Sequence, residues 1–439
     1  MKTKAKTMLT SSSFVLDDRI RGVPPGTPAI DSGAIGALGW HPADGRMMLP
    51  VLTLDEAAFL SNRDLFMRYV REKGVAVAPH GKTPMAPDLA RSLVEAGAWG
   101  TTVADVRQAA VMLRAGLTRL ILGNEVGGAG GAARLATLAA AFPKAEIYAF
   151  VDSAAAADAL AGAWRKTPEL TPLAVLVETG SGRAGARTLE RADAVIEAVL
   201  RSGGRLRLAG VAAYEGAAAR ATPEETDKAI GGLLALTADV LGHVRRHVGP
   251  DAPLIVTAGG SAYFDKVVDA LAPVARADGN ATLVLRSGAI FFHDHGVYDR
   301  GFEALDRRHG FSLGGETVTA RTSFRPALRL WAEVLSRPEP GLAVCGMGMR
   351  DVSFDQDLPI VVGIYRNGGA LPLPASLPTV TRLNDQHAFL SVPEGSDLAV
   401  GDVIEFGISH PCTCLDRYRV IFGVDGDGRV RHAFATFFG

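Results

Sequence analysis

The sequence places a lysine at the end of an apolar run, where its amine can be reactive. Lys82 stands in the run Pro79-His80-Gly81-Lys82-Thr83, which follows the apolar residues 75–78 and precedes a helical pattern. A lysine at such a strand end can be desolvated, which lowers its pKa and leaves a neutral amine for a Schiff base. A solvated loop lysine would have the same sequence, so position alone leaves both interpretations open.

A histidine and a cysteine near the C-terminus are candidate metal ligands. The run Ser409-His410-Pro411-Cys412-Thr413-Cys414 places His410 and Cys412 two residues apart. On an extended strand alternate side chains share a face, so His410, Cys412 and also Cys414 would point to one metal ion. Two or three protein ligands leave positions for water or substrate, as a catalytic metal needs. A buried histidine beside small apolar cysteines is the alternative.

Two glycine-rich turns are candidate ligand loops. The run Glu178-Thr179-Gly180-Ser181-Gly182-Arg183-Ala184-Gly185 delivers Arg183, whose guanidinium can bind a carboxylate or a phenolic oxygen. Gly259-Gly260-Ser261 precedes a helical pattern, and free N–H groups at a helix N-terminus attract phosphate. Ordinary turns use the same residue types, so each motif is weak by itself.

Other polar residues fall at the ends of expected strands. Asp105 stands where a helix N-cap belongs. The run His293-Asp294-His295 looks like a metal cluster, but on an extended segment Asp294 points away from the two histidines. We therefore expect a polar rim of the active site there rather than a metal. Further strand-end residues that can reach a barrel mouth are Thr102, Tyr214 and Thr257.

The hydrophobic pattern predicts a barrel that would position these residues. Short β-branched runs alternate with alanine- and leucine-rich stretches of helical period from Leu52 to Leu285. Eight such units predict an α/β fold with a (β/α)8 TIM-like barrel, and a first helix near Leu54–Glu72 precedes the first strand. The expected strands are Val75–Ala78, Gly100–Val103, Arg119–Leu122, Glu146–Val151, Leu173–Glu178, Leu208–Ala213, Leu254–Thr257 and Thr282–Leu285.

After about residue 300 the pattern changes to short alternating runs separated by Gly, Pro and Asp, which predicts an all-β domain. We expect an N-terminal arm over residues 1–50 that joins the β domain, a barrel over 51–300 and a C-terminal β domain over 301–439. The expected β runs include Glu333–Leu335, Ile360–Tyr365, Ala388–Val392 and Asp402–Phe406.

Composition argues against several kinds of partner. The 46 Lys plus Arg balance 47 Asp plus Glu, so the net charge of -1 lacks the basic surplus that nucleic acid or an anionic membrane selects. The first residues lack the apolar run of a signal peptide, and no later segment resembles a membrane span. The three cysteines form no disulfide framework, so we expect a soluble, cytoplasmic protein with reduced thiols.

Together these motifs resemble those of the D-threonine aldolase and D-serine dehydratase family, which has the alanine racemase fold. The resemblance runs from about Met48 to the C-terminus in the expected order, and it implies a head-to-tail homodimer and a β domain built from both chain ends. The matching stretches are the lysine motif at 79–83, the arginine stretch at 178–185, Tyr214-Glu215-Gly216, the phosphate loop at 259–261 and the metal motif at 409–412.

The resemblance also implies roles for individual residues. Lys82 would hold pyridoxal 5'-phosphate (PLP) covalently, with Tyr214 against the pyridine ring and Arg183 near its phenolic oxygen. His410 and Cys412 would hold a divalent metal, and the cysteine, at a position where the family's aldolases have an aspartate, favours zinc. The full set of expected cofactor contacts is His80, Lys82, Thr102, Arg183, Tyr214, Thr257, Gly259, Gly260 and Ser261.

From this resemblance we expect PLP- and zinc-dependent dehydration and deamination of a D-β-hydroxy amino acid, such as D-serine or D-threonine, to a keto acid and ammonia. Lys82 would act as the base, and the metal at His410 and Cys412 as the Lewis acid. Retro-aldol cleavage to glycine and an aldehyde is the first alternative. An amino acid racemase and a PLP-binding protein without turnover are the others.

Overall fold

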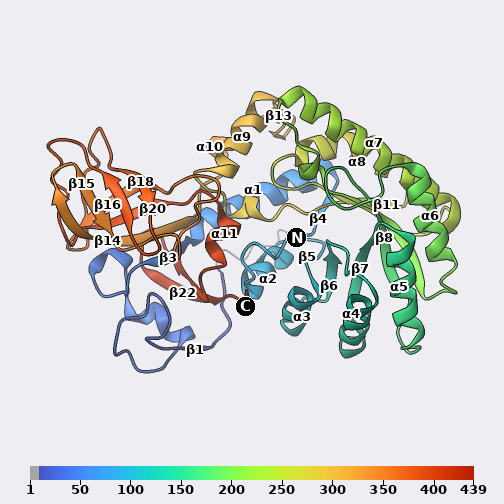
Figure 1. The fold of residues 1–439 in the computed structure, drawn as a ribbon, viewed down its shortest axis with the longest axis horizontal. Helices are drawn as coiled ribbons and strands as arrows, with labels where there is room; N and C mark the ends of the chain where they lie inside the picture. Colours follow the sequence, from blue (N-terminus) through green and yellow to red (C-terminus); the bar gives the residue numbers. More distant parts are fainter. Residues whose placement is uncertain (1–8) are drawn as a thin grey trace.

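The computed structural model describes residues 9–439, and its larger part is a curled sheet of eight parallel strands (Figure 1). The first eight residues of the expected N-terminal arm lie outside this description. The eight predicted strands are confirmed to within two residues. They are β4 Ala76–Val77, β5 Thr101–Val103, β6 Arg119–Leu122, β7 Glu146–Val151, β8 Leu173–Thr179, β9 Leu206–Ala213, β10 Leu254–Ala258 and β11 Ala281–Leu285.

Backbone hydrogen bonds bring the two edges of this sheet together. The N–H of Trp99 donates to the carbonyl of Val77 at 2.8 Å, and the N–H of Thr102 donates to Pro79 at 2.9 Å. The N–H of Gly81 donates to Thr102 at 2.7 Å. The chain that leads to Lys82 is therefore fixed against the neighbouring strand end.

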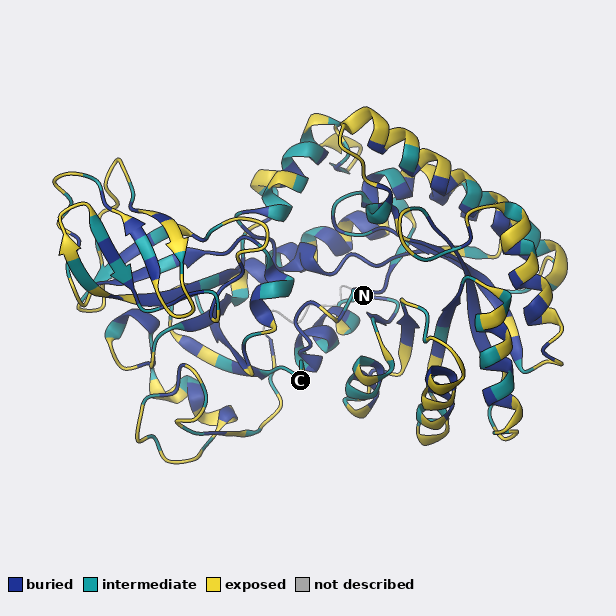
Figure 2. Ribbon diagram, in the orientation of Figure 1, coloured by how far each residue is buried: buried dark blue, intermediate teal, exposed yellow. Residues whose placement is uncertain are grey.

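Helices cover the outside of the barrel, and one follows each of the first seven strands (Figure 1). Asp105 caps α3, where its carboxylate accepts the N–H of Gln108 at 2.7 Å, as predicted. The strands are buried between these helices and the barrel interior (Figure 2). The helices are α1 Glu56–Lys73, which precedes β4, α2 Pro87–Glu95, α3 Val106–Arg114, α4 Ala129–Ala141, α5 Ala154–Arg165, α6 Leu189–Leu200, α7 Pro223–Val248 and α8 Phe264–Asp278.

The second part is a β domain, and the four predicted runs lie on or beside its strands β14, β16, β19 and β20. β3 (Val51–Asp55) lies in the range expected for the barrel, yet it pairs antiparallel with β14 and parallel with β21. The strands of this domain are β14 Leu328–Glu339, β15 Leu342–Cys345, β16 Ile360–Arg366, β17 Gly369–Ala370, β18 Thr379–Leu383, β19 Ala388–Ser391, β20 Val403–Gly407, β21 Val420–Val424 and β22 Val430–Ala435.

The described part of the N-terminal arm packs on the β domain. Ile35 and Trp40 of the arm share a buried apolar cluster with Trp331 and Phe422. The arm contains β1 Val15–Leu16, β2 Ile30–Asp31 and two short 3-10 helices, Ser32–Leu38 and Pro42–Asp44. Between residues 9 and 439, none of the helices is long and apolar enough to cross a membrane.

Short elements connect the barrel to the β domain. α9 (Val297–Arg307) and α10 (Ala320–Ser323) follow the last barrel strand, with β12 Ser312–Leu313 and β13 Glu316–Thr317 between them. α11 (Pro411–Leu415) follows β20 and lies where the two parts meet (Figure 1).

Candidate active site

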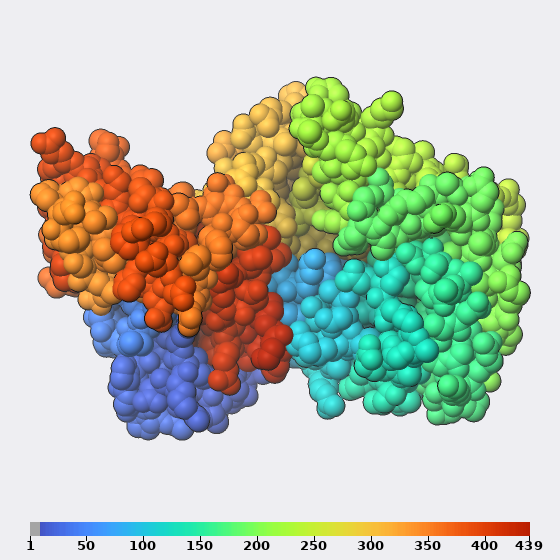
Figure 3. Space-filling model, in the orientation of Figure 1, coloured from blue at the N-terminus to red at the C-terminus, as the bar shows by residue number. Residues whose placement is uncertain are grey.

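A cavity of about 290 Å³ lies where the C-terminal ends of the barrel strands meet α9 and α11. The surface is hollowed between these parts (Figure 3). The loops after six barrel strands contribute side chains or backbone, and the β domain contributes two ligand-type residues. The lining residues are His80, Lys82, Thr83, Gly123, Asn124, Arg183, Tyr214, Gly260, Ser261, Arg286, Gly288, Ala289, Tyr298, His410 and Cys412.

The cavity brings together most, but not all, of the residues expected to contact the cofactor and the metal. Thr102, Thr257 and Gly259 do not line it. The hydroxyl of Thr102 donates to the carbonyl of Ala78 at 2.6 Å, and that of Thr257 donates to Val284 at 2.8 Å. These two hydroxyls therefore join neighbouring strands instead of facing a ligand.

Lys82 lines the cavity, as predicted. The sequence left a desolvated amine and a solvated loop lysine both open, and Lys82 is exposed in the single chain. Its backbone N–H lies 3.4 Å from Nδ1 of His80. Burial, and then the positive charges of Lys82 and Arg286, hold the pKa of His80 well below its usual value. His80 is therefore a neutral neighbour of the amine.

Arg183 and Tyr214, both expected at the cofactor ring, lie against each other. The guanidinium carbon of Arg183 lies 4.9 Å from the centre of the Tyr214 ring. Arg183 also lies 3.9 Å from the carboxylate of the buried Glu178. The arrangement gives the cavity a cation beside an aromatic face, which suits a planar anionic ligand.

The glycine turn after β10 is held by a carboxylate from the neighbouring strand end. Glu215 is fully buried, and it accepts the N–H of Gly259 at 3.0 Å and the N–H of Gly260 at 2.6 Å. The prediction assigned these two N–H groups to a phosphate, but the carboxylate already uses them. Between residues 9 and 439, the N–H groups of Ser261 and Ala289 have no hydrogen-bond acceptor, so they remain for an anion.

The cavity fits PLP by the chemistry of its lining. The side chains of Lys82, Arg183 and Tyr214 line one space together with Ser261 and Ala289, whose backbone N–H groups are unpaired in the described part of the chain. Glycine is needed at Gly288, because a Cβ there would lie 2.6 Å from the carbonyl oxygen of His80. The turn after β11 therefore packs directly on the backbone of the loop that carries Lys82.

Arg286 lines the cavity, and sequence reasoning missed it. The guanidinium is 7 % exposed and donates to the hydroxyl of Thr257 at 2.9 Å and to the carbonyl of Ala213 at 2.6 Å. An arginine at the end of the eighth expected strand was the available signal. Its bonds fix it as a buried positive charge at the cavity floor.

The buried carboxyl group of Glu178 lies beside Arg183 and the half-buried Glu125. Burial and then a hydrogen bond with Glu125 raise the pKa of Glu178 to about 9. Burial beside another acidic side chain favours the neutral form, so Glu178 stays protonated at neutral pH.

The candidate metal ligands meet in the cavity, but by a different local structure from the one predicted. His410 and Cys412 were expected on an extended strand, whereas residues 411–415 form the short helix α11 and His410 is its N-cap. Cys412 faces the cavity and Cys414 does not. Cys414 is fully buried outside the cavity, so the expectation that it shares the ligand face is wrong.

His410 and Cys412 nonetheless contact each other and fit an open metal site. Burial lowers the pKa of His410, but hydrogen bonds with Cys412 and Asp355 outweigh it and raise the pKa to about 9. Across the described chain, no cluster of three or more His, Cys, Asp or Glu residues suits a metal. An imidazole and a thiol side by side suit zinc with water or substrate at the remaining positions.

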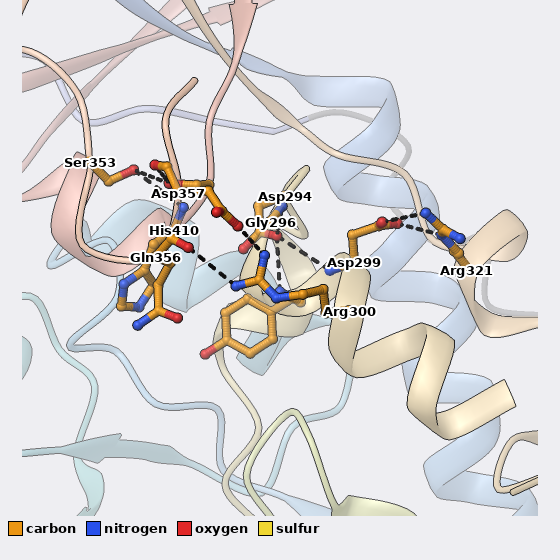
Figure 4. Close-up of polar contacts among 11 residues, drawn as sticks. Asp294, Gly296, Asp299, Arg300, Arg321, Ser353, Gln356, Asp357 and His410 are labelled. Atoms are coloured by element: carbon orange, nitrogen blue, oxygen red, sulfur yellow. Dashed lines mark hydrogen bonds and ion pairs between the residues drawn. The ribbon is translucent and has the colours of Figure 1, made fainter. Parts of the chain in front are cut away.

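The run His293-Asp294-His295 is not the polar rim that we expected. None of the three lines the cavity. Asp294 is buried, and its carboxylate accepts the N–H groups of Gly296 and Tyr298 at 2.8 and 2.9 Å at the start of α9 (Figure 4). Burial lowers the pKa of His293 to about 3, so this ring is neutral and packs on Phe302. The run therefore has a structural role at the start of α9.

The barrel, the β domain and the amine-bearing cavity define an alanine racemase-like protein. Residues 54–265 match the family "Alanine racemase, N-terminal domain", and residues 327–424 match the "Putative serine dehydratase domain". These matches confirm the resemblance to the D-threonine aldolase and D-serine dehydratase family that its motifs predicted.

Individual relatives cover nearly the whole chain. D-threonine aldolase of Arthrobacter sp. is 25 % identical over 370 residues, which are 83 % of this chain and 86 % of that protein. The crystal structure of D-threonine aldolase from Filomicrobium marinum is similar with a TM-score of 0.70 and 25 % identity, over 89 % of this chain and 95 % of the other. D-threo-3-hydroxyaspartate dehydratase from Delftia sp. HT23 shares the fold, with a TM-score of 0.65 and 22 % identity over 89 % and 97 %.

Proposed function

We propose that this chain is a PLP-dependent lyase that dehydrates and deaminates a D-β-hydroxy amino acid, with zinc at His410 and Cys412. The observation that carries the proposal is that Lys82 of the barrel and the His410–Cys412 pair of the β domain line one cavity. An amine and a metal site that face one substrate-sized space can act on neighbouring atoms of one molecule. The aldolase and dehydratase relatives support a β-hydroxy amino acid as the substrate class.

Each group that lines the cavity has a separate role in the proposed reaction. Bound PLP supplies an electron sink that acidifies the Cα–H of an amino acid joined to it. The Lys82 amine is the base that accepts this proton. Zinc held by His410 and Cys412 would supply a Lewis acid for the β-hydroxyl. Arg183 and the free N–H groups of Ser261 and Ala289 hold anionic groups.

Retro-aldol cleavage is the second candidate, and the sequence relative supports it. The Arthrobacter relative is a D-threonine aldolase. The two reactions use the same amine and metal and differ in whether the Cβ–O or the Cα–Cβ bond breaks. A thiolate at position 412 favours zinc and, by resemblance to the family's dehydratases, favours dehydration.

Product analysis tests the proposal. Purified PLP-loaded enzyme is incubated with D-serine, D-threonine and D-threo-3-hydroxyaspartate, and keto acid, ammonia and glycine are measured. Equal amounts of keto acid and ammonia are expected. Glycine without ammonia would overturn dehydration in favour of the retro-aldol reaction, and recovery of the L-enantiomer would indicate a racemase. Chelation should abolish turnover, zinc should restore it, and Lys82→Ala should lack the PLP absorbance that borohydride bleaches.

We also propose a head-to-tail homodimer, because Lys82 is exposed in the single chain. A neighbouring subunit over the cavity mouth would supply the desolvation that a reactive amine needs. Sedimentation analysis of the PLP-loaded protein should give the mass of two chains, and a stable active monomer would contradict this proposal.

A further inference from the structure

The loop Ser353–Asp357 of the β domain is hydrogen-bonded to His410 and to the residue before it (Figure 4). The N–H of His410 donates to the hydroxyl of Ser353 at 3.2 Å. The hydroxyl of Ser409 donates to the carbonyl of Asp357 at 2.7 Å. These bonds hold the main chain of the N-cap of α11 in one place.

Asp355 of the same loop holds the imidazole ring. Its Oδ2 lies 2.7 Å from Nδ1 of His410, and its Oδ1 accepts the hydroxyl of Thr413 at 2.6 Å. With Nδ1 donating to the carboxylate, Nε2 is the ring nitrogen that remains for a metal. The His410 side chain is 19 % exposed and that of Asp355 is 39 % exposed, so the pair is partly shielded from water.

We infer that Asp355 is the positioning residue of the metal site: it orients the His410 ring and strengthens Nε2 as a ligand. This inference rests on the proposed zinc site. A carboxylate on the far nitrogen of a metal-bound histidine fixes the tautomer and raises the basicity of the ligand. Thr413 occupies the second carboxylate oxygen and fixes the direction of the first.

Asp355 is better placed as a positioning residue than as a third ligand. Both of its oxygens are bonded to side chains, and the residue does not line the cavity that contains Lys82. It contacts the histidine through Nδ1, whereas a ligand would have to lie beside Nε2. A metal bound at Nε2 and Cys412 therefore has Asp355 behind the ring.

Zinc affinity of the PLP-loaded enzyme tests this role independently of turnover. The protein is freed of metal with a chelator, and the zinc Kd is measured by competition with a chromogenic chelator for wild type, Asp355→Ala and Asp355→Asn. Asp355→Ala should raise the Kd by about 10- to 100-fold, the usual cost of removing such a partner. Asp355→Asn should raise it less, because the amide oxygen still accepts the Nδ1 proton but has no charge.

Asp357→Asn is the matched control. Asp357 lies in the same loop, and its carboxylate binds Arg300 on the surface (Figure 4) and touches neither candidate ligand. Its zinc Kd should equal that of wild type. The spectrum of cobalt bound in place of zinc should change with Asp355→Asn and not with Asp357→Asn, because only the first alters the ring of a ligand.

The possible results distinguish the positioning role of Asp355 from the existence of the metal site. If wild type binds zinc tightly and loses it with His410→Ala, but both Asp355 variants match Asp357→Asn, the positioning role is wrong and the metal site stands. If wild type binds zinc no better than His410→Ala, the metal site and this inference are both overturned. Should Asp355→Ala fail to fold, the Asp355→Asn comparison decides in the same way.

Discussion

Glu215→Gln tests how the glycine turn at the cavity is held. Glu215 is fully buried, and its two carboxylate oxygens accept the N–H groups of Gly259 and Gly260 at 3.0 and 2.6 Å. Glutamine has nearly the same shape but offers one oxygen and one NH2 group. In the variant, one of the two backbone N–H groups therefore faces another donor.

The size of the effect follows from these two bonds. A hydrogen bond to a charged group contributes about 1.5–3 kcal/mol, and a buried donor left without an acceptor costs about 1–3 kcal/mol. Because the substitution removes one bond and leaves one donor unpaired, we expect the free energy of unfolding to fall by roughly 2.5–6 kcal/mol. Whole domains are stable by only about 5–15 kcal/mol, so the loss is easily measured.

Urea unfolding followed by circular dichroism and tryptophan fluorescence measures this loss. Trp99 and Trp164 report on the barrel, so the barrel transition should move to lower urea. Glu394→Gln is the control, because Glu394 is exposed in a loop and its substitution should change stability by less than about 0.5 kcal/mol. If Glu215→Gln shifts the transition no more than the control does, the carboxylate does not hold the turn.

Three further predictions follow from single contacts. Gly288→Ala should destabilise the protein by about 1–3 kcal/mol, because a Cβ there would lie 2.6 Å from the carbonyl of His80. Gly231→Ala should stabilise it by about 0.5–1 kcal/mol, because a Cβ at this position of α7 meets open space. Urea unfolding measures both changes. Burial and then Glu125 raise the pKa of Glu178 from an ordinary 4.5 to about 9, so the folded state binds a proton that the unfolded chain releases. The stability of the folded protein should therefore fall as the pH rises between these two values. Thermal scans at a series of pH values should show a flatter dependence of Tm on pH for Glu178→Gln than for wild type. The hydroxyl of Thr83 lies 3.3 Å from the sulfur of Cys412, so Thr83→Val should weaken zinc binding by chelator competition, while Thr83→Ser, which keeps the hydroxyl, should not.

The barrel could be predicted because its strands are visible locally. β8 is buried at all seven residues, so it reads as an apolar run bounded by turn residues. β3 could not be assigned in this way, because its partners in β14 lie about 275 residues away and nothing near Val51–Asp55 marks the pairing. Strands whose environment comes from remote segments have no local signature.

The candidate site was predictable where residue type alone implies chemistry. Lys82, Arg183 and His410 were found because amines, guanidinium groups and imidazoles stand out at strand ends. The short helix at residues 411–415 was predictable from the sequence, because Pro411 occupies the first helical position, which proline favours. Asp355 had none, because its role exists only through the distance to Nδ1 of His410.

The backbone contact between the barrel and the β domain explains why Lys82 and the His410–Cys412 pair, which lie on different domains, can line one cavity. The N–H of His295 donates to the carbonyl of Ile408 and that of Val297 donates to Ser409, both at 2.9 Å. A Cβ on Gly296 would lie 2.5 Å from the carbonyl of Ser409, so the two backbones are in direct contact. The segment after the last barrel strand is thus bonded to the residues that precede His410. Backbone bonds of the segment that contains His293-Asp294-His295 therefore hold the residues before His410 against the end of the barrel.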